Sequence, residues 1–179
     1  DGGKLACVDV AGSHGLVALV VLAMGLTDDV TVIDPFRPKS FDTLVAAFES
    51  ASLLPHGHAL RYDERPLDAA LPELLRGRGR EVMVVACHAC AHLTREIVEI
   101  SLAASAAGIA VLPCCHSRRT VAGANRAKAA ADALGLPLGV VADVAMFGAL
   151  EQAGYESRLR LVECSEEANR AVVAVRRVA

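Results

Sequence analysis

Five short apolar runs, each followed by a segment of helical character, constrain the fold of this chain more than any other feature of its sequence. Apolar runs that alternate with helices are typical of parallel strands in a sheet that is covered on both faces. The pattern therefore predicts an α/β fold with a mostly parallel sheet between two layers of helices. The runs, of which the third is the weakest, occupy residues 5–10, 30–34, 58–63, 81–87 and 109–115.

The segments between these runs predict helices, and three residues mark expected boundaries within them. Ser40 is a residue type that commonly caps a helix, so the second helix should begin beside it. Pro72 lacks a backbone N–H and is expected to interrupt the third helix, and Gly108 is expected to end the fourth. The expected helices span residues 16–25, 40–54, 66–75, 93–108, about 121–134 and 139–153.

The last two strand-like runs, residues 155–164 and 169–177, have only a short acidic turn between them. Without a helix to carry the chain back, they are expected to pair antiparallel. The whole pattern predicts a Rossmann-like, doubly wound, mostly parallel sheet of seven strands that ends in an antiparallel hairpin. We expect a single domain over residues 1–179, because no linker or repeat divides the chain. The first residue is Asp and a strand follows at once, so we expect a natural N-terminal segment to be missing.

Composition narrows the classes of protein that this fold can serve. Hydrophobic residues make up 54% of the chain and aromatic residues only 3%, and the net charge is −3. This balance provides neither a basic field that requires nucleic acid nor aromatic platforms for single-stranded bases. The apolar runs are too short or too interrupted to cross a bilayer. The six cysteines do not follow a disulfide-scaffold pattern, so we expect reduced thiols and a cytoplasmic protein.

Acidic and small residues gather where the first three predicted strands end. Asp9, Asp34 and Asp63 lie at or just past these ends, and Gly12 and Gly15 lie in the turn after the first strand. Ligands of open α/β sheets bind outside the carboxyl ends of the strands, and a helix N-terminus there favours a negative group. Each acid also has a structural alternative: Asp9 accepts backbone amides, Asp34 caps the following segment, and Asp63 is solvated.

A dinucleotide is a poor match for this turn. Its fingerprint requires G-x-G-x-x-G, but counting from Gly12 the second glycine is replaced by His14 and the third by Val17. Without the second glycine, the backbone would keep a pyrophosphate at a distance.

The succession of features resembles the class I S-adenosylmethionine-dependent methyltransferases over nearly the whole chain. Those proteins share the C-terminal hairpin, the acid and small-residue turn of residues 9–15, and acids after strands two and three, here Asp34 and Asp63. The resemblance implies S-adenosyl-L-methionine as cofactor, with Asp34 on the ribose hydroxyls and Asp63 on the adenine amino group. The implied cofactor-binding residues are Asp9, Ala11, Gly12, His14, Gly15, Asp34, Asp63 and Cys87.

Two further motifs resemble one branch of that superfamily, which includes the tRNA ribose 2′-O-methyltransferases. They are CHACAHLT at 87–94 and PCCHSRRT at 113–120, supported by Asn169-Arg170 before the last strand. Two features depart from the family. His14 replaces the usual middle glycine and would narrow the amino-acid end of the pocket, and the helix that normally precedes strand one is absent. The second departure leaves the cleft partly open unless residues before Asp1 or a partner cover it.

The cysteines and histidines of these two motifs should converge, because strands four and five are neighbours in such a sheet. One interpretation is a zinc site at 87–92 and 114–116, since Cys87-x-x-Cys90 has ligand-like spacing. Adjacent strand residues point to opposite faces, however, so Cys114 and Cys115 rarely bind one ion together. The ligands of such a site would be Cys87, Cys90, Cys115 and His116.

The second interpretation is the acceptor side of a methyltransferase pocket. His88 or His116 would act as a base, because the pKa of a free imidazole lies near neutrality. Arg118 and Arg119 would hold a phosphate or carboxylate of the substrate. The third interpretation is structural, since free cysteines are commonly buried like small apolar residues, as expected for Cys7 and Cys164. The segment RGRGR at 76–80 reads as an exposed basic loop, with phosphate contact as its alternative.

The sequence therefore predicts an S-adenosylmethionine-dependent methyltransferase (class EC 2.1.1) whose acceptor is an RNA, a small molecule or a protein. Two alternatives remain open from the residues: a zinc-binding enzyme or module built on the Cys/His cluster, and a degenerate, non-catalytic subunit with a methyltransferase fold. The replacement at His14 and the abrupt start at strand one favour the latter.

Overall fold

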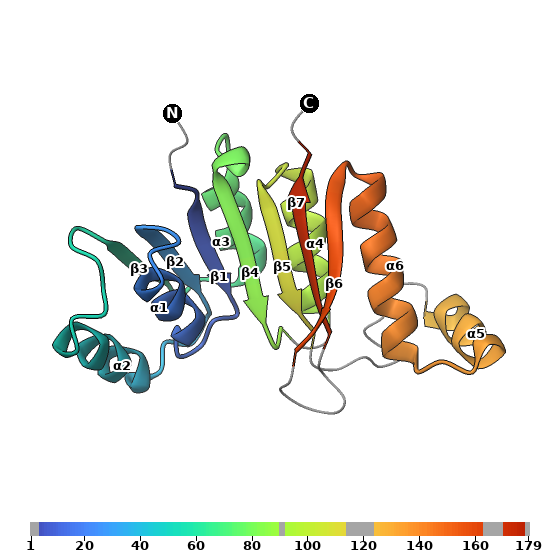
Figure 1. Ribbon diagram of the computed structural model, residues 1–179, viewed down its shortest axis with the longest axis horizontal. Coiled ribbons are helices and arrows are strands. Elements are labelled where there is room, and N and C mark those ends of the chain that lie inside the picture. Colours follow the sequence, from blue (N-terminus) through green and yellow to red (C-terminus); the bar gives the residue numbers. More distant parts are fainter. Residues whose placement is uncertain (1–3, 90–91, 114–123, 163–169, 178–179) are drawn as a thin grey trace.

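Seven strands form one twisted sheet in the computed structural model, which describes residues 4–89, 92–113, 124–162 and 170–177 (Figure 1). Their order across the sheet is β3-β2-β1-β4-β5-β7-β6. The strands are β1 (Ala6–Val10), β2 (Asp29–Ile33), β3 (Ala59–Asp63), β4 (Val82–Cys87), β5 (Gly108–Leu112), β6 (Tyr155–Leu161) and β7 (Arg170–Arg176).

Helices connect the parallel strands, as the alternating pattern predicted. They are α1 (Leu16–Ala23), α2 (Lys39–Ser50), α3 (Leu67–Leu75), α4 (Leu93–Ala103), α5 (Ala124–Leu134) and α6 (Leu138–Gln152), with a short 3-10 helix η1 (Gly79–Glu81) before β4. Within the described part of the chain, no single helix is long and apolar enough to cross a membrane, although the sharply bent pair α5–α6 is by length and composition.

The strand pairing confirms the predicted Rossmann-like topology. β1 pairs in parallel with β2 on one side and with β4 on the other, so the order of the sheet reverses between β1 and β4. β7 pairs antiparallel with both β5 and β6, which confirms the predicted C-terminal hairpin. Such a reversal point is where open α/β sheets bind their ligands.

The two faces of the sheet are covered unequally. Apolar residues of α3, α4 and α6 pack with strand residues into the larger core, and α1 and α2 cover the opposite face over β1 and β2. On that second face Val85 of β4 still packs against the α1–α2 cluster, but no described helix covers β5 and β7, and Figure 1 looks onto this open half. Helices lie on both faces as predicted, but on the second face those of the described residues cover only the half around β1 and β2.

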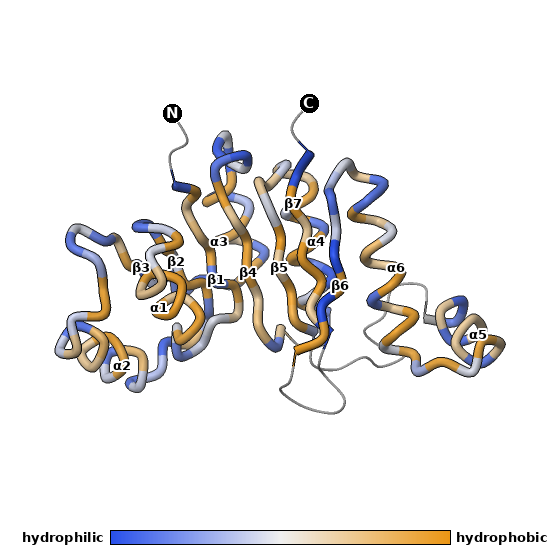
Figure 2. Tube along the Cα trace, viewed as in Figure 1, coloured by the Kyte–Doolittle hydropathy of each residue, from blue (hydrophilic) through white to orange (hydrophobic). Residues whose placement is uncertain are grey.

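The residues of the open half explain why sequence alone indicated burial. β4 places Met83 and Val85 on this face, and the register sets Ala110 of β5 and Val173 of β7 beside Val85. These four residues are only partly buried, and Val175 of β7 is 54% exposed. Figure 2 shows the same strands as largely hydrophobic. The expectation that a preceding segment or a partner covers the cleft stays a prediction.

Three details of the predicted helices are wrong: the cap of α2, the interruption of α3 and the end of α4. α2 begins at Lys39 after Pro38, so Ser40 lies inside the helix and its hydroxyl contacts the His14 ring instead of capping. α3 continues through Pro72, because apolar residues on both sides of the proline stay buried. α4 ends at Ala103, and Gly108 begins β5, where a side chain would collide with the Met83 sulfur.

Candidate functional site at the carboxyl ends of β1 to β4

The turn after β1 alternates between ordinary and left-handed backbone. Ala11, Ser13 and Gly15 have φ angles of 55°, 43° and 68°. Left-handed residues favour glycine, so the glycine-like positions of this turn are 11, 13 and 15. The prediction that His14 replaces the middle glycine is therefore wrong by one residue, since Ser13 holds that position. Counting the glycine fingerprint from Gly12 could not reveal that the left-handed positions are 11, 13 and 15.

Close packing holds the turn in place. A side chain at Gly12 would lie 2.7 Å from Asp9 Oδ2 and 2.9 Å from Val32 Cγ1. One at Gly15 would lie 2.6 Å from the ring of Phe41 in α2. The backbone amide of Ala11 also donates to the Ile33 carbonyl oxygen at 2.8 Å. The turn is thereby fixed against β1, β2 and α2 at once.

Asp9 lies beneath this turn and not on its surface. Its side chain has no solvent exposure, and Oδ2 accepts a hydrogen bond from the Ala18 amide at 3.1 Å. Oδ1 is buried without a hydrogen-bond partner among the described residues. Burial raises the pKa of Asp9 to about 6, which the Ala18 bond opposes and the Asp34 carboxylate reinforces. This geometry matches the structural alternative, in which Asp9 supports the first turn of α1, and its contact with a cofactor stays a prediction.

Asp34 is the acid that reaches the surface of the same edge. It follows β2 directly and is half-buried. Its Oδ2 accepts a hydrogen bond from the Ser13 amide at 3.1 Å and its Oδ1 from the Phe36 amide at 3.0 Å. One carboxylate therefore ties the turn after β1 to the turn after β2. An ionised carboxylate has about four acceptor positions, so half of them stay available to a ligand.

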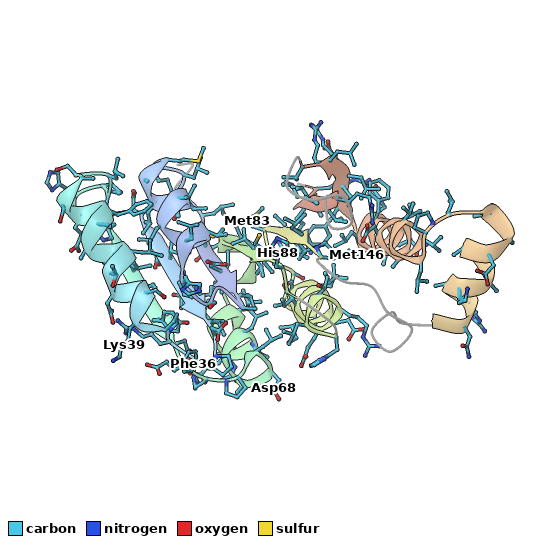
Figure 3. The ribbon with its side chains drawn as sticks, turned by 90° about the horizontal axis from the view of Figure 1, so that it is seen from below. Phe36, Lys39, Asp68, Met83, His88 and Met146 are labelled. Atoms are coloured by element: carbon cyan, nitrogen blue, oxygen red, sulfur yellow. The ribbon has the colours of Figure 1, made fainter. Side chains whose placement is uncertain are left out.

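Phe36 is a feature of this edge that sequence reasoning missed. Phe36 is 72% exposed and lies two residues after Asp34, in a chain with only four phenylalanines. Figure 3 looks onto the edge where the parallel strands end and shows Phe36 there, on the side of α2. An aromatic residue directly after Asp34-Pro35 was the available signal in the sequence. An exposed ring next to an anchored carboxylate offers a flat apolar surface to a base.

Behind Phe36, Tyr62 of β3 supports both turns. Its hydroxyl lies 2.8 Å from the Ser13 carbonyl oxygen and 3.0 Å from that of Phe36 and donates to this pair of acceptors. The Tyr62 and Phe41 rings meet edge to face at 4.8 Å, with the Arg37 guanidinium over both. Burial, and then the Asp34 carboxylate, raises the pKa of Tyr62 to about 12, so the hydroxyl keeps its proton. Sequence reasoning did not identify this residue either.

Asp63 ends β3 as predicted, but Arg65 already occupies its carboxylate. The guanidinium Nε and Nη2 atoms donate to Asp63 at distances from 2.7 to 3.2 Å, and the Arg65 amide adds a bond of 3.1 Å. These bonds, led by the guanidinium, hold the pKa of Asp63 below its usual range. Arg65 Nη1 also donates to Glu73 Oε2 of α3 at 2.6 Å.

At the end of β4 the structure places Cys87 in the strand and His88 directly after it. His88 has a left-handed φ of 59°, and its amide donates to the Leu112 carbonyl oxygen at 2.9 Å. The imidazole is exposed in the middle of the edge seen in Figure 3. A left-handed histidine is uncommon, and such strain gathers at functional sites, which favours a role for His88.

The remaining predicted site residues, Cys90, Cys115, His116, Arg118 and Arg119, lie outside the described residues, as does Cys164. Cys87 is thus the only described member of the zinc set, and within the described residues no three potential ligands gather. Cys7 is buried as predicted, and burial followed by the nearby Asp9 charge raises its thiol pKa to about 12.

The sheet order, the C-terminal hairpin and the turns at this edge define a Rossmann-like methyltransferase fold. Known structures agree with it. The antibiotic-resistance methyltransferase Kmr aligns with a TM-score of 0.62 at 18% identity, over 98% of this chain and 89% of its own. Precorrin-6y C5,15-methyltransferase from Geobacter metallireducens aligns at 0.53 and 13% identity, over 98% and 81%.

An O-methyltransferase family protein from Burkholderia thailandensis aligns with a TM-score of 0.53 and 15% identity over 96% of this chain. The chain spans 51% of the length of that protein. No protein-family model matches the sequence, and neither does any curated protein. At these identities the likeness is one of fold.

Proposed function

We propose that the chain is an S-adenosylmethionine-dependent methyltransferase that binds its cofactor across the carboxyl ends of β1, β2 and β3. The observation that carries the proposal is the Asp34 carboxylate. It is anchored by the Ser13 and Phe36 amides, half open to solvent and flanked by the exposed Phe36 ring. It occurs in a fold shared with methyltransferases of known structure.

The residues present fit this cofactor. The free acceptor positions of Asp34 suit the two ribose hydroxyls, and the Phe36 ring provides a face for adenine. The turn of residues 11–15 leads into the N-terminus of α1, which favours the carboxylate of the amino-acid end. His14, tied to α2 through Ser40, borders that end of the cleft.

Adenine recognition by Asp63 depends on the position of Arg65. Arg65 engages both carboxylate oxygens of Asp63, so an adenine amino group can donate there only if Arg65 shifts. Arg65 is exposed and already bonded to Glu73, which can retain it in a new position. We propose that Arg65 gives way to adenine, so that Asp63 exchanges one donor for another.

The acceptor side is proposed to lie beside His88. When bound, the cofactor supplies an electrophilic methyl group, so the protein has to orient the acceptor and remove its proton. The exposed His88 imidazole at the end of β4 is suited to accept that proton. His116 is the second candidate base, and Arg118 and Arg119 are proposed to hold an anionic group of the acceptor.

Three acceptor classes compete for this place: RNA ribose hydroxyls, small molecules and proteins. The resemblance of the segments at 87–94 and 113–120 to tRNA ribose 2′-O-methyltransferases supports RNA. The precorrin methyltransferase neighbour, named for a small molecule, supports the second class. We also propose that the protein works in the cytoplasm, where its cysteines stay reduced.

Calorimetric titration of the chelator-treated protein with S-adenosylhomocysteine tests the proposal. One saturable site is expected. Asp34→Asn should weaken the affinity for S-adenosylhomocysteine about tenfold or more, because the side-chain amide carries no charge and its NH₂ group repels one of the donors that the carboxylate accepts. Asp28→Asn, at the other end of β2, is the matched control and should bind like the natural chain. No binding would overturn the proposal: with early melting after chelation it would indicate a metal site, and without it a non-catalytic subunit.

A further inference from the structure

A second pocket lies beside the edge strand β3, where the strand faces α3. This pocket is open to solvent and has a volume of about 530 Å³. Thr31 of β2 and Arg61 of β3 line it and are direct partners in the strand register, two residues before the strands end at Ile33 and Asp63. Leu74 and Arg78 line it from the side of α3. Asp63, Glu64 and Arg65 line it at the end of β3, so the pocket reaches from the proposed cofactor edge to Arg61 within the strand.

Two guanidinium groups are held together at one end of this pocket. Asp29, at the start of β2, forms an ion pair through Oδ1 with Arg61, while its Oδ2 lies 3.6 Å from Arg78 Nη2. The carboxylate thus orients both side chains from behind, and each keeps further N–H donors. A planar fork of donors matches the oxygens of phosphate and carboxylate groups.

Arg78 also has a donor atom that lacks an acceptor in the described part of the chain. Its Nε atom is buried and has no hydrogen-bond partner within the described residues. A buried donor left unsatisfied costs stability, and a turn of the Arg78 guanidinium toward a bound oxyanion would satisfy it. Arg65, the third arginine of the pocket, contrasts with it, because Asp63 and Glu73 engage its guanidinium.

We propose that this pocket binds a small molecule through a phosphate or carboxylate group held between Arg61 and Arg78. The volume suits a ligand of nucleotide size. Glu64 also lines the pocket, so the remainder of the ligand can present a donor or a positive charge to it, whereas Asp63 is engaged by Arg65. The pocket shares Tyr62, Asp63 and Arg65 with the proposed cofactor edge. The two arginines that would hold the anion, Arg61 and Arg78, have no part in the proposed cofactor site, so the proposal stands whether or not the chain is a methyltransferase.

Titration at low ionic strength with inorganic pyrophosphate and, separately, with malonate tests this site. We expect one saturable site with a dissociation constant below about 1 mM for at least one of the two anions. Arg61→Gln and Arg78→Gln should each weaken binding about tenfold. The matched control is Arg80→Gln, an exposed arginine of the same loop that does not line the pocket, and it should change binding less than about twofold.

Each further outcome has a defined meaning. Binding of pyrophosphate alone identifies a phosphate-bearing ligand, and binding of malonate alone identifies a carboxylate. Binding that survives Asp34→Asn separates the site from the cofactor edge, whereas binding lost with Asp34 would overturn the proposal. Absence of a saturable site for both anions would also overturn it, and so would an equal loss in Arg80→Gln. Circular dichroism of each variant shows that it folds.

Discussion

The two halves of the sheet use their faces differently. In the half formed by β1 to β3, α1 and α2 cover one face and close contacts fix each turn at the carboxyl edge. In the half formed by β4 to β7, one face carries partly exposed apolar residues and no described helix. The first half has helices packed on its second face, whereas the second half has its described helices only on the face of the larger core. The cofactor edge that we propose lies in the first half, and the proposed acceptor side, beside His88, lies in the second.

The largest expected effect is at Gly15. Gly15→Ala combines a left-handed backbone with a collision against the Phe41 ring, so it should destabilise the fold by about 3 kcal/mol or more. Gly25→Ala is the control, because Gly25 has φ +66° but nothing lies within 4 Å. It should cost about 1 kcal/mol. Urea unfolding of both variants measures the difference, and equal losses would show that packing does not fix this turn.

The second effect concerns Asp9 and pH. The pKa of Asp9 is about 6 in the folded chain against an ordinary 3.8. This difference corresponds to a change of about 3 kcal/mol in the free energy of unfolding between low and high pH. Between these values the folded chain holds more protons than the unfolded chain, so this group lowers stability as pH rises from about 4 to 6. Asp9→Asn should remove most of that fall, about 2 kcal/mol. Urea unfolding at several pH values measures this effect, with Asp28→Asn as control. If the free energy of unfolding falls as steeply with pH in Asp9→Asn as in the natural chain, Asp9 is not the buried carboxyl group that titrates.

Two tyrosines, one in each half of the sheet, allow the two halves to be compared directly. Tyr62 donates to the turns of the cofactor edge, and Tyr155 of β6 donates to the Ala106 carbonyl oxygen at 2.7 Å. Replacing either by Phe should cost about 1 kcal/mol of stability. Only Tyr62→Phe should also weaken S-adenosylhomocysteine binding, by about threefold, because it loosens Ser13 and Phe36. If both variants bind the ligand equally, the first half has no special role in holding it.

The smallest effect is expected on the open face. Val175 is 54% exposed there, whereas Val172 of the same strand is fully buried on the covered face. Val175→Thr should change the free energy of unfolding by less than about 0.5 kcal/mol. Val172→Thr buries a hydroxyl and should cost about 1 to 2 kcal/mol. Comparable losses would mean that something covers Val175 in solution.

Much of the fold was predictable because its signals are local. Apolar runs, the helical segments between them and the short acidic stretch of sequence before β7 identified the strands and the hairpin. What failed depends on contacts distant in sequence: Gly108 belongs to β5 because of Met83, and α3 passes Pro72 because its neighbours are buried. The open face could not be predicted, since Met83 and Val85 are apolar whether covered or not.

The candidate site was predictable in part for a related reason. The acids were expected at strand ends, which spacing defines, and Asp34 and Asp63 lie there. Their different surroundings were not, because burial and the Arg65 pairing follow from packing. Phe36 and Tyr62 act through exposure and through bonds to Ser13, which no spacing reveals. The glycine register failed because φ angles, not letters, define the turn.

The position of β7 has a consequence for how the protein is made. This strand follows β6 in the chain but lies between β5 and β6 in the sheet. A nascent chain that has reached β6 cannot yet attach it to β5, because the strand that joins them is still to come. Until then the β5 edge offers unpaired backbone groups, beside the open apolar face, to any other nascent chain. The sheet closes only when its last strand is inserted, which makes assembly slow and strongly cooperative.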